Sequence, residues 1–280
     1  MGLGVSGCSA SPEAGGDAGR RVTPVNPRDV LDRPARKPDA VLTYGKHPDQ
    51  LLDVHLPPRP VDGAAPAPVV VFLHGGFWRQ AFDRTHTRPL AEALAAEGYV
   101  VVTPEFRRSG GDGGYPETFD DVAAALDAVP TIESVAPGRA DLADVTLAGH
   151  SAGGHLAMWA ALRPGGLSGG LSVRRVVALA PVAALVSAYE RGLDGDAVEA
   201  LMGGSPAELP AAYAAADPSR MLPGAVPITV IHGDRDDRVP VEMSRALTGV
   251  SYVELDGMEH FGLIDPLSTA WPAVLAAIKG

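Results

Sequence analysis

Ser151 stands at the centre of the pentapeptide at positions 149–153, Gly-His-Ser-Ala-Gly, in which the serine hydroxyl is a candidate nucleophile. A short run in which apolar and polar residues alternate precedes the pentapeptide, as in a strand, and an apolar helix-forming segment follows it. The pentapeptide is therefore predicted to form a turn from a strand to a helix. A serine raised above a sheet edge on such a turn needs neighbours without side chains two residues before and after it. The alternative is an ordinary glycine-rich turn, in a chain that contains 33 glycines.

A serine hydroxyl is a weak nucleophile near neutral pH, so Ser151 needs a general base, and the base needs an orienting carboxylate. Two later loops supply such groups, residues 231–240 (Ile-His-Gly-Asp-Arg-Asp-Asp-Arg-Val-Pro) and residues 256–261 (Asp-Gly-Met-Glu-His-Phe). His260 follows the last predicted strand and is the candidate base. The first loop offers three candidate carboxylates: Asp234, Asp236 and Asp237.

The elements that must position these residues alternate between strands and helices. Continuous apolar runs such as residues 69–73 suit strands that are covered on both faces, as in a parallel sheet. Strands are predicted at residues 41–45, 51–57, 69–73, 99–103, 145–148, 173–180, 227–231 and 251–255. Helices are predicted at about residues 89–98, 116–129 and 153–162, from about residue 240, and at the end of the chain, where Asp265 is the expected N-cap.

This order of elements predicts a mostly parallel central sheet with helices on both faces, joined by right-handed crossovers. Residues 181–223 break the rhythm, because they are rich in alanine and interrupted by glycine and proline, and they are predicted to form a small helical lid. Ligands bind such sheets at the carboxyl ends of the strands. Ser151 and both later loops fall there.

The ordered set of motifs resembles the α/β-hydrolase superfamily. In these enzymes the catalytic triad follows the order serine, aspartate, histidine along the chain, and Ser151, Asp236 and His260 have that order here. Residues 232–240 resemble the H-G-x-x-D-x-x-V-P loop of the superfamily. The resemblance selects Asp236 as the carboxylate of the triad, and Asp234 and Asp237 remain the alternatives. It implies the α/β-hydrolase fold and covalent catalysis by Ser151 with His260 as the base, without a cofactor.

Residues 74–78, His-Gly-Gly-Phe-Trp, follow the first buried strand, where hydrolases of the H-G-G-G type place N–H donors for an oxyanion. The resemblance therefore assigns the oxyanion hole to the backbone N–H groups of Gly76, Phe77 and Ala152. Trp78 is predicted to bind substrate by lining, with Phe77, a pocket for an acyl or aryl group. The alternative is a glycine turn with an aromatic residue that plugs the core.

The H-G-G-aromatic-Trp form resembles the kynurenine formamidases and the related feruloyl-esterase-like and small carboxylesterases. The likeness covers most of residues 41–280. Phe77 departs from it, because formamidases often carry tyrosine there. Arg107, which lies within the likeness, is predicted to anchor a loop to a carboxylate rather than to contact substrate.

Length and composition restrict the class of protein further. A chain of 280 residues can form one large α/β domain with a substantial core. The 34 acidic and 23 basic residues give a net charge of −11, which disfavours nucleic acid as a partner. No apolar run approaches the ~20 residues that a membrane-spanning helix needs. Cys8 is the single cysteine, so neither an internal disulfide nor a cysteine-rich zinc site is expected.

Residues 1–40 are rich in glycine, alanine, serine, proline and arginine, and they are predicted to form a flexible leader or tether before a hydrolase domain at residues 41–280. Residues 5–8, Val-Ser-Gly-Cys, resemble the lipid-attachment box of bacterial lipoproteins, but no basic segment and no full apolar segment precede them. The chain as written is therefore predicted to be cytoplasmic. A lipoprotein anchored to the membrane through Cys8 is the alternative if the true start lies upstream.

These observations predict a serine hydrolase that cleaves a small-molecule substrate, either a carboxylic ester or the formamide of an arylamine, through an acyl-enzyme. A prolyl-oligopeptidase-like serine peptidase is one alternative, since its catalytic domain uses similar loops. The other is a hydrolase fold that binds without catalysis, although such proteins commonly lose a member of the triad and all three are present here.

Overall fold

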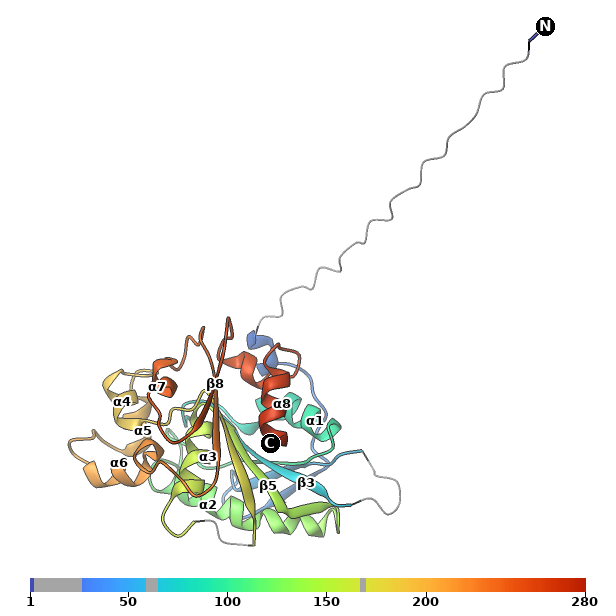
Figure 1. The fold of residues 1–280 in the computed structure, drawn as a ribbon. Helices are drawn as coiled ribbons and strands as arrows, with labels where there is room; N and C mark the ends of the chain where they lie inside the picture. The colour runs from blue at the N-terminus through green and yellow to red at the C-terminus, as the bar shows by residue number, and fades with distance from the viewer. Residues whose placement is uncertain (3–26, 59–64, 167–169) are drawn as a thin grey trace.

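The computed structural model describes residues 1–2, 27–58, 65–166 and 170–280. In this part of the chain eight strands form one sheet, in the order β1-β2-β4-β3-β5-β6-β7-β8 (Figure 1). The strands are β1 (Ala40–Thr43), β2 (Leu51–His55), β3 (Ala67–Leu73), β4 (Val100–Pro104), β5 (Ala140–His150), β6 (Val173–Leu179), β7 (Ile228–Gly233) and β8 (Ser251–Leu255). Strand β2 pairs antiparallel with β1 and β4, and the other neighbouring strands pair in parallel. The predicted mostly parallel sheet is confirmed.

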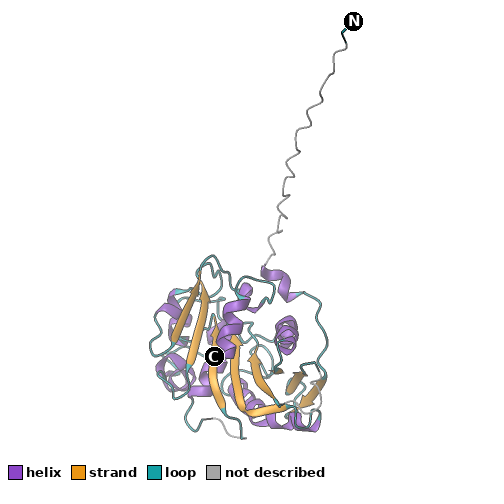
Figure 2. Ribbon diagram, turned by 45° about the vertical axis from the view of Figure 1, so that its right-hand side comes forward, coloured by secondary structure: helices purple, strands orange, loops and turns teal. Residues whose placement is uncertain are grey.

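Helices cover both faces of this sheet (Figure 2). The α-helices are α1 (Arg88–Ala96), α2 (Glu117–Ala128), α3 (Ala152–Leu162), α4 (Leu185–Glu190), α5 (Ala197–Met202), α6 (Pro210–Ala216), α7 (Glu242–Arg245) and α8 (Trp271–Lys279). The short 3-10 helices are η1 (Pro27–Leu31), η2 (Arg84–Thr87), η3 (Val129–Ser134), η4 (Pro218–Arg220) and η5 (Phe261–Ile264). The short helices α4, α5 and α6 occupy the predicted insertion at residues 181–223.

The central strands are apolar on both faces because each face packs against helices. In β3, Val70 and Phe72 belong to an apolar cluster with side chains of α1 and α8. Val69, Val71 and Leu73 alternate with them and belong to a second cluster, which includes side chains of α2 and α3. All five side chains are buried. Two apolar cores, one on each face, therefore hold the sheet in place. The predicted site lies at the carboxyl ends of its strands.

The last helix begins later than the sequence predicts. Asp265 is not its N-cap, since α8 starts at Trp271. The Asp265 carboxylate instead pairs with Arg33 and accepts a hydrogen bond from the backbone N–H of Leu267. Leu267, which lies before α8, is 67% exposed, whereas Val274 within α8 is buried. A carboxylate already committed to an arginine and a local turn leaves the helix to start one turn further on.

The predicted leader differs from the structure at its C-terminal end. Cys8 and the proposed lipid-attachment box lie outside the described residues. Residues 27–40, placed in the leader by their composition, include η1, whose Val30 is fully buried. Leu31 packs against the same apolar cluster. Two adjacent apolar side chains help to dock this segment, and an average over 40 residues conceals them. Among the helices of the described ranges, none has the length and apolar character needed to cross a bilayer.

Candidate active site

Ser151 occupies a strained turn between β5 and α3. Its backbone angles, φ 56° and ψ −118°, lie in a region that residues with side chains rarely adopt. A Cβ atom at Gly149 would lie 2.2 Å from the carbonyl oxygen of Gly153, and one at Gly153 would lie 2.1 Å from that of Leu73. The two glycines therefore allow the backbone approaches that hold this turn, as the pentapeptide predicts.

Asp236 and His260 form a direct hydrogen bond. The Nδ1 atom of His260 lies 2.6 Å from Oδ2 of Asp236. The other carboxylate oxygen accepts the backbone N–H groups of Arg238 and Val239, both at 2.8 Å. Burial alone would raise the pKa of Asp236, but hydrogen bonds from His232 and His260 lower it below its usual value. The carboxylate is thus held ionised and in one orientation.

The alternative carboxylates have other partners. Asp234 accepts a hydrogen bond from the backbone N–H of Gly257 at 2.7 Å, which fixes the turn before the base loop. Asp237 is exposed and lies 3.0 Å from the guanidinium of Arg28. Of the three candidates, the structure therefore pairs Asp236 with His260.

His232 supports the carboxylate from the opposite side. Its Nε2 atom donates to Oδ2 of Asp236 at 3.0 Å, and its Nδ1 atom accepts from the hydroxyl of Ser244 at 2.7 Å. The ring is fully buried at the end of β7. It therefore orients the Asp236 carboxylate and does not line the cavity.

His150, the residue before Ser151, links the turn to the base loop. Its Nε2 atom donates to the carbonyl oxygen of His260 at 3.0 Å, and the centroids of the two rings lie 4.3 Å apart. Burial holds the pKa of His150 well below its ordinary value, so the ring is neutral. Within the described residues, no hydrogen bond joins the Ser151 hydroxyl to the His260 ring. Such contacts often tighten only when substrate binds.

One cavity, of about 440 Å³, brings Ser151 and His260 together. Its apolar wall includes Phe77, Phe82, Phe261, Ala81 and Leu31. Phe82, Phe261 and Leu31 were not predicted to line the cavity. Phe261 ends the loop that carries His260, whereas Phe82 and Leu31 lie outside the quoted motifs and reach the cavity only through the fold. A second cavity, of about 480 Å³, is lined by residues such as Arg36, Glu92 and Arg139 and contains none of the catalytic candidates.

The predicted oxyanion loop lies against the serine turn. A Cβ atom at Gly75 would lie 3.2 Å from the Cβ atom of Ser151. Gly76 and Phe77 follow with φ angles of 115° and 49°, and both line the cavity. No acceptor in the described residues is hydrogen-bonded to the N–H groups of Gly76 and Phe77, so these groups are available to a ligand. The geometry suits the assignment of these donors together with Ala152.

Trp78 does not line the cavity, and the predicted contact with substrate is wrong for this residue. Its side chain is 1% exposed, and its Nε1 atom donates to Nδ1 of His155 at 3.2 Å. Burial lowers the pKa of His155 to about 4, so the ring is neutral and Nδ1 can accept. The left-handed backbone at Phe77 and Trp78 directs the indole into the core, leaving Phe77 at the cavity. The alternative reading, an aromatic residue that plugs the core, describes Trp78.

A buried ion pair anchors the predicted oxyanion loop. The Nε2 atom of His74 donates to Glu105 at 2.9 Å, and the ring of His74 stacks on Phe106 with a centroid separation of 4.4 Å. Arg108 lies 2.8 Å from the same carboxylate. Burial would raise the pKa of Glu105, but His74 and Arg108 lower it to about 2. The loop therefore starts from a buried charged site in which His74 and Arg108 both contact the Glu105 carboxylate.

Arg107 also anchors the neighbouring loop, as predicted. Its guanidinium donates to both carboxylate oxygens of Asp121, at 2.9 and 2.8 Å. Gln50 donates to the same carboxylate at 2.7 Å. The bidentate geometry fixes the segment after β4 to α2 and leaves Arg107 away from the cavity.

Comparison with known proteins gives this site a context. The model of the BD-FAE family matches residues 52–250. Esterase LipC of Mycobacterium tuberculosis is 29% identical over 248 residues, which cover 81% of this chain and 60% of LipC. The probable carboxylic ester hydrolase LipM of the same organism is 28% identical over 261 residues, 84% of this chain and 59% of LipM. This chain thus covers about 60% of the length of these curated relatives.

Solved structures share the fold. A putative thioesterase from Silicibacter sp. TM1040 superposes with a TM-score of 0.67 and 25% identity, covering 90% of this chain and 88% of that one. Esterase B from Lactobacillus rhamnosis superposes with a TM-score of 0.69 and 24% identity, covering 90% and 88%. The strand order, the turn at Ser151 and the family match lead to one conclusion: the chain has the α/β-hydrolase fold and belongs to the BD-FAE family.

Proposed function

We propose that this chain is a serine hydrolase that cleaves carboxylic esters through a covalent acyl-enzyme. Ser151 attacks the carbonyl carbon while His260 takes the hydroxyl proton, and His260 then returns that proton to the departing alcohol. Asp236 holds the ring in the required tautomer and stabilises its charged form. The 2.6 Å hydrogen bond between Asp236 and His260, at the cavity that contains the strained serine, is the observation that carries this proposal.

The oxyanion of the tetrahedral intermediate is proposed to bind the backbone N–H groups of Gly76, Phe77 and Ala152. Donors fixed in this way act without reorganisation and supply a large part of the rate enhancement in acyl transfer. The proximity of the Gly75 backbone to Ser151 and the position of Ala152 at the start of α3 support the assignment.

The substrate is proposed to be a small carboxylic ester, because the named relatives are esterases. The formamide of an arylamine is a narrower form of the same proposal, based on the likeness of residues 74–78 to formamidases. Both are carbonyl compounds that could transfer an acyl group to the Ser151 hydroxyl. Rates measured side by side on short p-nitrophenyl esters, a feruloyl ester, N-formylkynurenine and a prolyl peptide distinguish the substrate classes.

Replacement of Ser151 tests the proposal directly. We expect Ser151→Ala to abolish both hydrolysis of p-nitrophenyl acetate and labelling by a fluorophosphonate probe. Ser134→Ala is the matched control, since this exposed serine bonds only its own turn, and it should keep both properties. Labelling retained in Ser151→Ala, or the absence of esterase activity from the native chain, would refute the proposal.

A further inference from the structure

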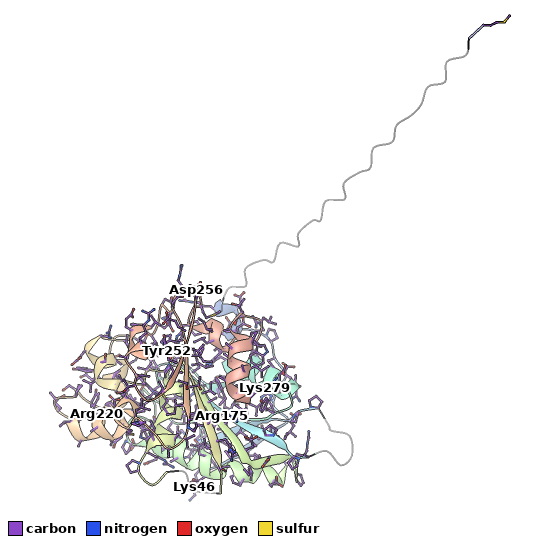
Figure 3. All side chains as sticks on the ribbon, in the orientation of Figure 1. Lys46, Arg175, Arg220, Tyr252, Asp256 and Lys279 are labelled. Carbon is purple, nitrogen blue, oxygen red and sulfur yellow. The ribbon has the colours of Figure 1, made fainter. Side chains whose placement is uncertain are left out.

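The segment at residues 27–33, named here the N-terminal strap, lies along the cavity that contains Ser151 and His260. Three residues of the strap, Arg28, Leu31 and Asp32, line that cavity. Figure 1 shows η1, in blue, at the end of the molecule where β8 ends, and Figure 3 labels Asp256, the residue that follows β8. A segment that the sequence places in a leader thus contributes to the substrate site.

Two ion pairs and a buried side chain hold the strap in place. Arg28 lies 3.0 Å from Asp237, and its guanidinium carbon lies 5.9 Å from the centroid of the Phe261 ring. At the other end, Arg33 pairs with both carboxylate oxygens of the buried Asp265. The first partner belongs to the loop of the acid and the second follows the loop of the base. The strap therefore bridges the two loops that carry Asp236 and His260.

The position of the strap relates it to one half of the substrate. In acyl transfer the base gives its proton to the leaving group, so the leaving group must lie on the side of the base. Phe261 directly follows His260, with ring centroids 5.2 Å apart, and Arg28 lies over Phe261. Phe82, in contrast, packs on Gly76 of the oxyanion loop. The strap and Phe261 thus border the side of the base.

We infer, on the basis of the proposed esterase function, that the N-terminal strap forms the wall of the leaving-group half of the cavity. Leu31 is its specificity-determining residue. It limits the size of the alcohol that the enzyme can release, so esters of short alcohols are favoured over esters of bulky ones. The acyl half, beside Phe77 and Phe82, is independent of the strap.

Two pairs of substrates test this division. Ethyl butyrate and cyclohexyl butyrate differ only in the alcohol, whereas ethyl acetate and ethyl hexanoate differ only in the acyl chain. We expect Leu31→Trp to lower the ratio of kcat/KM for cyclohexyl over ethyl butyrate about tenfold, and Leu31→Ala to raise it, because a change of pocket size by a few carbon atoms discriminates by about that much. The acyl ratio should stay within about twofold in both variants.

Leu267→Trp is the matched control, because Leu267 is exposed and does not line the cavity. It should change neither ratio. The inference is overturned if the alcohol ratio is unaffected in Leu31→Ala and Leu31→Trp, or if the acyl ratio changes in its place. Should Leu31→Trp fail to fold, Leu31→Ala and Arg28→Ala decide by the same ratio. Failure of the proposed function looks different, since the native chain would then hydrolyse none of the four esters.

Discussion

The hydrogen bond between Nδ1 of His260 and Oδ2 of Asp236 leaves Nε2 as the only ring nitrogen of His260 that can exchange a proton at the cavity. The carboxylate is itself held by His232 and by two backbone N–H groups. A carboxylate with this many donors does not rotate away or take up a proton at ordinary pH. Asp236 therefore determines both the tautomer and the direction of the base.

Replacing Asp236 by asparagine should lower kcat/KM for p-nitrophenyl acetate by about 10³–10⁴, because the amide favours the wrong tautomer of the base. Asp256→Asn is the control, an exposed carboxylate at the end of β8 (Figure 3), and it should stay within about twofold of the native rate. Steady-state rates on both folded variants decide. Activity within tenfold of native in Asp236→Asn would exclude the residue as the orienting acid.

The fold and the centre of the site could be predicted because their signals are local. Apolar runs of strand length alternate with helical segments, and the pentapeptide at residues 149–153 is a single local pattern. Gly149 is required by a contact with Gly153 inside that turn, whereas the contact that requires Gly153 is with Leu73 of β3. Local signals could not select Asp236 over Asp234 and Asp237, since all three carboxylates share one loop. The resemblance of residues 232–240 to a hydrolase loop supplied this choice, and the hydrogen bond between His260 and Asp236 agrees with it.

Phe77 was predicted to line a pocket, but the rest of the cavity wall could not be predicted, because it is assembled from distant segments. Phe82 and Leu31 reach the cavity only after η1 and η2 dock, and neither lies in a motif. Trp78 shows the opposite error. It belongs to a motif, but a left-handed backbone turns its indole into the core, and the residue type alone does not reveal that rotation.

Gly153→Ala should destabilise the fold by roughly 3 kcal/mol or more, because the new Cβ atom would lie 2.1 Å from the carbonyl oxygen of Leu73 and the neighbouring backbone cannot yield cheaply. Gly138→Ala is the matched control. At Gly138 φ is 64° and no atom lies within 4 Å of the added Cβ, so only the left-handed backbone costs energy, about 1–2 kcal/mol. Free energies of unfolding from urea titrations compare the two. Equal losses would mean that the turn at Ser151 is not held by this contact.

Glu105 should make the protein less stable in acid. Its pKa of about 2 in the folded state, against 4.5 for the unperturbed group, is equivalent to about 3 kcal/mol of stability. Because the folded-state pKa is depressed, this contribution is complete above pH 4.5 and disappears as the pH falls towards 2. Glu105→Gln should therefore be less stable at pH 7 and should lose less stability than the native chain between pH 5 and pH 3.

Free energies of unfolding at pH 7, 5 and 3 measure the effect of Glu105. The exposed Glu190→Gln serves as the control and should follow the native pH dependence. Parallel curves for the native chain and Glu105→Gln would show that the contacts of Glu105 with His74 and Arg108 do not contribute in the way their geometry indicates.

Trp78→Phe and Phe82→Ala should have opposite effects, because one side chain fills the core and the other lines the cavity. Trp78→Phe leaves a void and an unpaired Nδ1 atom on His155, so we expect a loss of about 2–4 kcal/mol in the free energy of unfolding. The ratio of kcat/KM between acetate and hexanoate esters should be preserved in the folded enzyme.

Phe82 is 47% exposed, so Phe82→Ala should cost less than about 1 kcal/mol of stability while shifting the acyl ratio about tenfold. Thermal unfolding and the same pair of ethyl esters measure both quantities on both variants. A shifted acyl ratio in Trp78→Phe with unchanged stability would return Trp78 to the substrate pocket. A large loss of stability in Phe82→Ala would instead make Phe82 part of the packed framework that supports Gly76.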